Sequence, residues 1–182
     1  MRPFRLQDLV PWRELTIDTT WPPEVVAIEI RKRLAPRVPR PLYAFGFGVP
    51  SPDHPFVGKG EGAHFVFSRA IGYRNSFLPV IILSVAAHDE GSRLNLRMRL
   101  NAVVMAFMGV WMTGATIGSL SIAVAGLYDG NPAGLVGLLF PLFGGGLMSG
   151  GFAYEARRAE ALLRDIFPTP PPPPPEPVGP YR

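Results

Sequence analysis

Two long stretches without a charged residue constrain the fold of this chain more than any other feature. One covers the 29 residues 100–128, and the other covers the 25 residues 130–154. A helix needs about 20 mainly apolar residues to cross a bilayer, and both stretches are longer than that. The turn formers of Asp129–Pro132 separate them. We therefore predict a transmembrane helical hairpin with spans at 102–126 and 133–153.

The alternative is a pair of core helices in a soluble protein, but a chain of 182 residues has too little other mass to cover both helices. Basic residues flank the pair and are absent from its connecting loop: Arg93, Arg97, Arg99, Arg157, Arg158 and Arg164. Positive charge favours the cytoplasmic side of a membrane. The N-terminus also lacks the apolar core of a signal peptide. We expect a multi-pass protein of the bacterial inner (cytoplasmic) membrane with both termini in the cytoplasm.

Small residues are concentrated in the two spans, where 12 of the 20 glycines lie between positions 109 and 151. Small residues let helix backbones approach closely in lipid. GxxxG spacing relates Gly114 to Gly118 and Gly146 to Gly150, and further small-residue tracks run through Ala115, Ser119 and Ala123 and through Gly145 and Ser149. These faces serve either packing within the hairpin or contact with another subunit. Trp111, inside the first span, is expected to pack on the partner helix's glycines or to meet a partner subunit, a lipid or a pigment.

Pro141 lies inside the second span and removes a backbone donor, so we expect a kink there. Neither span contains Asp, Glu, Lys, Arg or His. Ionisable residues inside a membrane mark ion and proton pathways. Their absence argues against a transporter or a pump.

The first 99 residues predict a small α+β domain, in which a strand and a helix precede a β-meander. The clearest pattern is the strict alternation at 92–100, which is typical of a half-buried strand. A turn at Asp89-Glu90-Gly91 precedes it. The other expected elements are strands at 13–19, 43–49, 64–72 and 77–87, a loop at 50–62, and a helix that starts at Thr20 as its cap and ends before Pro36.

The predicted organisation is therefore a cytoplasmic α+β domain at 1–99, the hairpin at 100–154, an amphipathic cytoplasmic helix at 155–167 and a proline-rich tail at 168–182. The apolar face of that helix would comprise Ala156, Ala159, Leu162, Leu163 and Ile166. Nine of the tail's 15 residues are proline, which leaves only polyproline II open to it. The tail is either a solvated extension or, over Pro168–Pro180, a ligand for a groove on a partner.

One loop motif between two expected strands, Tyr73-Arg-Asn-Ser-Phe-Leu-Pro79, stands out from ordinary connecting sequence. The guanidinium of Arg74 could bind backbone carbonyls or a lipid phosphate. Arg97 and Arg99 would lie at the membrane surface, where anionic headgroups are available. Together with the following hairpin and apolar span, the motif resembles an uncharacterised family of small bacterial membrane proteins over residues 40–165. The resemblance implies the fold and the topology and carries no activity or site residue.

The sequence offers little catalytic chemistry, so we expect no enzyme, cofactor or metal site. There is no cysteine, and the histidines His54, His64 and His88 lack metal-ligand spacing. The glycines of 58–62 match no phosphate-binding fingerprint and are expected in a loop. A net charge of +4 fits the membrane surface, and no motif points to nucleic acid.

Two functions remain. The first is a non-catalytic accessory or structural subunit of a larger membrane complex, for example photosynthetic or respiratory, with lipids and other membrane-protein subunits as partners. The second is a membrane-anchored module that binds lipid or a small ligand.

Overall fold

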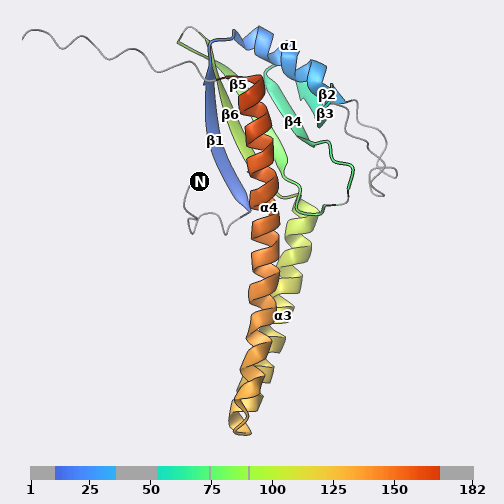
Figure 1. Ribbon diagram of the computed structural model, residues 1–182, viewed down its shortest axis with the longest axis vertical. Coiled ribbons are helices and arrows are strands. Elements are labelled where there is room, and N and C mark those ends of the chain that lie inside the picture. The colour runs from blue at the N-terminus through green and yellow to red at the C-terminus, as the bar shows by residue number, and fades with distance from the viewer. Residues whose placement is uncertain (1–10, 36–52, 74, 90, 169–182) are drawn as a thin grey trace, which may run out of the picture.

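A mixed α/β domain stands on a long helical hairpin in the computed structural model of the protein (Figure 1). The structure describes residues 11–35, 53–73, 75–89 and 91–168. The strand expected at 43–49 and almost all of the proline-rich tail lie outside these ranges. The described residues contain a six-stranded sheet and three α-helices, two of them long and apolar enough to cross a membrane.

The sheet has one parallel pair, β2 with β3, and its other neighbouring strands are antiparallel. The first described strand, β1, pairs with β6, the strand that leads into the hairpin, so β1 forms one edge of an open sheet. The spatial order is β1 (Trp12–Thr19), β6 (Gly91–Arg99), β5 (Val80–His88), β4 (His64–Arg69), β3 (Phe56–Glu61) and β2 (Leu34–Ala35). The expected alternation is present in β6, whose Leu94, Leu96 and Met98 are fully buried.

One face of the sheet carries the core, which helix α1 (Pro23–Arg33) and the last part of α4 cover (Figure 1). Val26 and Ile30 of α1 are buried there. The cap of α1 is Pro22, which makes no side-chain hydrogen bond, and not Thr20 as expected. The fixed φ of proline prepares the first turn without a capping side chain.

The expected loop at 50–62 is wrong, because strand β3 occupies Phe56–Glu61. Gly58 lies opposite Phe67 and Gly60 opposite Phe65 in the neighbouring strand. A Cβ atom at Gly60 would lie 2.0 Å from the ring of Phe65. Gly60 therefore makes room for the core ring of Phe65. A Cβ atom at Gly58 would instead lie 2.3 Å from the backbone oxygen of Val66 and 2.5 Å from the Cα atom of Phe67. Glycine usually weakens a strand, and at Gly60 the aromatic ring of the paired strand fills the space it leaves.

The hairpin consists of α3 (Ala102–Tyr128), the 3-10 helix η2 (Pro132–Leu138) and the first half of α4 (Leu139–Ile166). The side chain of Asn101 caps α3 by accepting a hydrogen bond from the Val103 amide. Pro141 is the third residue of α4, a position whose amide has no partner within an α-helix, so the donor that proline lacks costs no hydrogen bond there. A departure from α geometry lies directly before it, in η2, and the expected kink stays a prediction.

Helix α4 continues without a break from the hairpin onto the sheet (Figure 1). The structure thus differs from the separate helix expected at 155–167, because those residues end a single helix of 28 residues. Such a helix is about 42 Å long. Its buried residues after position 151 include Phe152, Ala156, Ala159 and Leu163. One rigid element therefore links the apolar hairpin to the core of the domain.

Candidate functional site: a buried carboxylate where the hairpin meets the sheet

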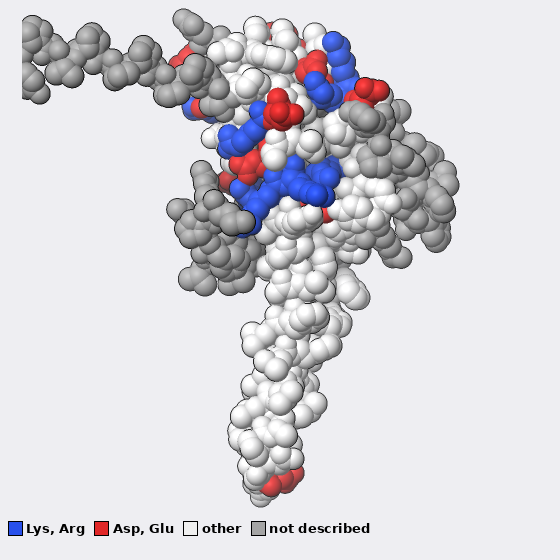
Figure 2. Space-filling view, viewed as in Figure 1, with Lys and Arg blue, Asp and Glu red and all other residues white. Residues whose placement is uncertain are grey.

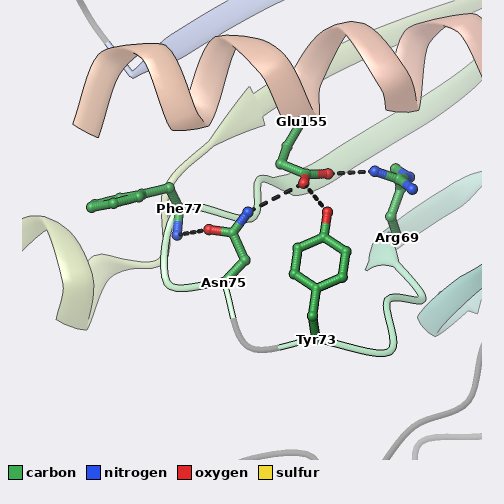
Figure 3. A network of polar contacts seen from close by, with 5 residues as sticks. All are labelled: Arg69, Tyr73, Asn75, Phe77 and Glu155. Carbon is green, nitrogen blue, oxygen red and sulfur yellow. Dashed lines mark hydrogen bonds and ion pairs between the residues drawn. The ribbon is translucent and has the colours of Figure 1, made fainter. Parts of the chain in front are cut away.

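Glu155 is a fully buried charged residue at the point where α4 reaches the sheet. One of its carboxylate oxygens accepts a hydrogen bond from Arg69 at the end of β4. The other accepts from the Tyr73 hydroxyl and from Asn75 Nδ2, the latter at 3.2 Å (Figure 3). A buried carboxylate is tolerated only when it is paired and hydrogen-bonded. Glu155 meets both conditions with three donors from one short segment.

The loop that supplies two of these donors is the motif that the sequence singled out. Asn75 Oδ1 accepts the amide hydrogen of Phe77 at 2.9 Å, which folds the loop into an Asx turn (Figure 3). Because the turn uses Oδ1, the side-chain nitrogen Nδ2 of Asn75 can face Glu155. The ring of Phe77 covers Gly151 of α4, where a Cβ atom would lie 3.0 Å from the ring. The motif is therefore a clamp on α4. Arg74, expected at a lipid headgroup, lies outside the described residues.

The electrostatics of this network favour a neutral Tyr73 hydroxyl. The hydrogen bond to Glu155 raises the pKa of the Tyr73 hydroxyl, and burial acts in the same direction. Only 12% of the Arg69 side chain is exposed, so its charge is largely withdrawn from water. Among the described residues, Arg69 Nε has no hydrogen-bond partner. Glu155 is therefore the group that balances the buried charge of Arg69.

Two further contacts fix α4 beyond Glu155. Glu160 forms an ion pair with Arg13 of β1 and accepts a hydrogen bond from Arg164 Nε at 2.9 Å. The buried ring of Phe167 meets Trp21 edge to face, with ring centroids 5.6 Å apart. The helix is therefore held by a strand on either side and by an aromatic contact at its end.

Within the hairpin, the close contacts involve glycines other than those of the GxxxG pairs. A Cβ atom at Gly144 would lie 2.5 Å from the indole of Trp111, and the same indole meets the ring of Phe140 at 5.2 Å between centroids. Ser119 and Ala123 of α3 are buried. Trp111 thus packs on a glycine of the neighbouring helix, which is one of the two alternatives that its position inside the span left open.

The four GxxxG glycines face away from the hairpin's own interface. Among the described residues, a Cβ atom at Gly114, Gly118, Gly146 or Gly150 would meet no atom within 4 Å other than the nearby backbone of its own helix. The hairpin packs through its other small-residue tracks, so these four positions are not needed to hold it together. Contact of these positions with a partner stays a prediction.

The two described arginines expected at lipid headgroups lie on the face of the sheet opposite the core. Arg97 Nε is 3.0 Å from a carboxylate oxygen of Glu14. Arg99 is exposed and is the last residue of β6, two positions before the cap of α3. The strand places both side chains on one face, but only Arg97 has an acidic neighbour there among the described residues.

The described residues hold no cluster of three or more side chains suited to a metal ion. His64 lies at a shallow groove of about 730 Å³ on the sheet's open face, shared with Ser84 and Asn95. His88 contacts Asp89 and Arg93 at the far end of the β5–β6 hairpin. The most developed polar cluster is therefore the Glu155 network. Its carboxylate accepts three hydrogen bonds from the segment beside α4, an arrangement that positions the helix.

Sequence reasoning identified the clamp loop and missed the residue that it holds. Glu155 and Glu160 are the first two acidic residues after the second apolar stretch, and no site was predicted at either of them. The available signal was their position on the helix, since Glu155 lies on the same face as Ala156, Ala159 and Leu163. A carboxylate within an apolar face implies a buried partner. The partner itself, Arg69, is 86 residues away in sequence.

Comparison of the chain with models of protein families, with curated proteins and with solved structures gives no match. The resemblance to a family of small bacterial membrane proteins therefore stays a prediction.

Proposed function

We propose that this chain is a non-catalytic integral membrane protein that serves as a structural subunit of a larger membrane complex. The first support is the exposure of the hairpin. Only 6% of the most apolar stretch of α3 and 22% of that in the second helix are buried. The core helix of a soluble protein would be mostly covered, so a lipid environment suits these side chains better than water.

The observation that carries the proposal is the outward direction of the GxxxG glycines. In lipid, helices associate through close backbone contact at small residues. The hairpin makes its internal contacts elsewhere, at Trp111 on Gly144 and along Ser119 and Ala123. Gly114 and Gly118 on α3 therefore form a small-residue face that no other described segment contacts. A helix of another subunit is the partner that such a face fits.

The rigid junction supports the same role. Because α4 is continuous and its carboxylates bind Arg69 and Arg13, the domain is held in one orientation on the hairpin. In a structural subunit, such a connection fixes where the domain lies relative to the membrane. The Glu155 clamp would keep the sheet at a fixed place beside a partner.

The proposal includes an orientation. We place the α/β domain and both termini on the cytoplasmic side of a bacterial inner membrane, with Asp129 at the far side. The arginines on both sides of the hairpin support this orientation, as does the absence of basic residues from its tip. A photosynthetic or respiratory complex would be a natural host.

Site-specific cross-linking in native membranes tests the proposal. The chain has no cysteine, so a single cysteine at Gly118 gives a unique attachment point. We expect a thiol-reactive photo-cross-linker at this position to give one discrete product of higher mass. Leu120→Cys is the matched control, because it is also exposed and two residues turn the side chain by about 200° around the helix. Equal cross-linking at both positions, or none at Gly118, would contradict the proposal.

A further inference from the structure

The arginines of β6 differ in how their charges are balanced. Arg93 lies opposite Asp18 in the register of β1 and bonds to it at 2.7 Å. Arg97 lies opposite Glu14 and bonds to it at 3.0 Å. Arg99 instead lies opposite Trp12 on one side and Val80 on the other. The described residues give Arg99 no ion pair.

The unbalanced arginine is the one nearest the hairpin. Arg99 ends β6, and α3 begins at Ala102. Opposed residues in neighbouring antiparallel strands share a face and lie about 5 Å apart at Cβ. The guanidinium of Arg99 therefore emerges between an indole and a valine, at the end of the sheet that faces the apolar helices. Trp12 is 47% exposed, which is unusual for so large an apolar side chain.

This combination fits the interface of a bilayer. Tryptophan favours the headgroup level of a membrane because its ring is apolar and its N–H is polar. Arginine binds phosphate with a planar array of donors. Figure 2 shows basic residues at the end of the domain that adjoins the hairpin. Below them, the hairpin has no charged residue until its acidic tip. Exposed Arg158 and Tyr154 of α4, 4.9 Å apart from guanidinium carbon to ring centroid, belong to this region of the chain.

We propose that Trp12, Arg99 and Val80 form a binding site for the headgroup of an anionic phospholipid. Arg99 holds the phosphate, and Trp12 and Val80 contact the glycerol and the first methylenes. Arg97 forms an ion pair with Glu14, so it contributes little to lipid binding. The proposal narrows the expectation for Arg97 and Arg99 to Arg99 alone. It rests on insertion of the hairpin into a membrane and is independent of any partner subunit.

Native mass spectrometry of the full-length protein in detergent tests the site. Dioleoyl phosphatidylglycerol is the anionic probe, and dioleoyl phosphatidylcholine is the zwitterionic one. We expect the protein to retain phosphatidylglycerol preferentially and Arg99→Gln to weaken its binding about fivefold, the factor that corresponds to about 1 kcal/mol for one arginine at an anionic surface. Trp12→Leu should weaken it as well, whereas Arg99→Lys should keep most of the binding.

Arg97→Gln is the matched control, since it removes the same charge from the same face of the same strand. It should stay within twofold of the wild type. Equal retention of the two lipids, or equal loss in Arg99→Gln and Arg97→Gln, would overturn the lipid site. Failure of the protein to remain in liposomes at high pH would overturn the proposed membrane role instead, so the two outcomes are distinct.

Discussion

Removing the carboxylate of Glu155 should destabilise the protein by about 3 kcal/mol. Breaking a buried ion pair from one side costs about 3–5 kcal/mol, because the other charge stays buried without compensation. Glu155 is fully buried and its partner Arg69 is 12% exposed, so Arg69 can recover some solvent contact. That access places the expected loss for Glu155→Leu at the lower end of the range. It corresponds to a fall of roughly 6–12 °C in Tm for a chain of this size.

A double-mutant cycle separates the ion pair from simple packing. If the cost comes from a lone buried charge, Glu155→Leu with Arg69→Met should be less destabilised than the sum of the two single variants by about 1–3 kcal/mol. Thermal unfolding in detergent, followed by tryptophan fluorescence, measures this, because Trp21 contacts Phe167 at the end of α4.

Glu61→Leu is the control for losing an acidic side chain. Glu61 is exposed at the end of β3, so its replacement should change stability by no more than about 0.5 kcal/mol. The reasoning fails if Glu155→Leu resembles Glu61→Leu. It also fails if the losses of the two single variants add in the double variant, since additivity would mean that the two charges do not depend on each other.

Three further changes test other parts of the structure. Gly144→Leu should destabilise the hairpin by about 1–3 kcal/mol, because its Cβ would lie 2.5 Å from the indole of Trp111; unfolding in detergent measures this, and Gly146→Leu, in open space, should be neutral. Gly60→Val should destabilise the sheet by at least as much, because its Cβ would lie 2.0 Å from a core ring. A midpoint of thermal unfolding in detergent equal to that of the wild type would contradict this. Tyr73 has a raised pKa, so its contribution to stability is complete below its ordinary pKa of 10.0 and is lost as the pH rises through the raised value. The loss of stability at alkaline pH should therefore be smaller in Tyr73→Phe than in the wild type. An unchanged alkaline profile would show that the bond to Glu155 contributes nothing.

Local patterns in the sequence predict much of the fold. The alternation of Leu94, Leu96 and Met98 with polar residues predicts β6, because a strand that is buried on one face needs that period. The two charge-free stretches likewise predict helices close to the α3 and α4 that the structure contains. Each of these elements is determined by residues next to one another in the chain.

The features that sequence reasoning missed depend on contacts between distant residues. The sequence around Gly58 and Gly60 predicts a loop, because only the pairing with the neighbouring strand shows that Phe67 and Phe65 lie beside these glycines. In the same way, the clamp on Glu155 joins residues about 80 positions apart, and nothing near Glu155 in sequence indicates which arginine it meets.

The outward glycines required the structure for a different reason. Both small-residue tracks of α3 satisfy the spacing for close packing, and sequence alone does not say which one the hairpin uses. Ser119 and Ala123 are buried, so their track packs within the hairpin. The space at Gly114 and Gly118 is empty, so the GxxxG track does not.

The most direct test of the proposed role is the mass of the particle that contains this chain after mild detergent extraction from its native membrane. A structural subunit should appear at fixed stoichiometry in a complex much heavier than its own 19.9 kDa, and Gly114→Leu with Gly118→Leu should release it from that complex. Recovery of the wild-type chain as a lone monomer, with no partner at constant ratio, would contradict the account.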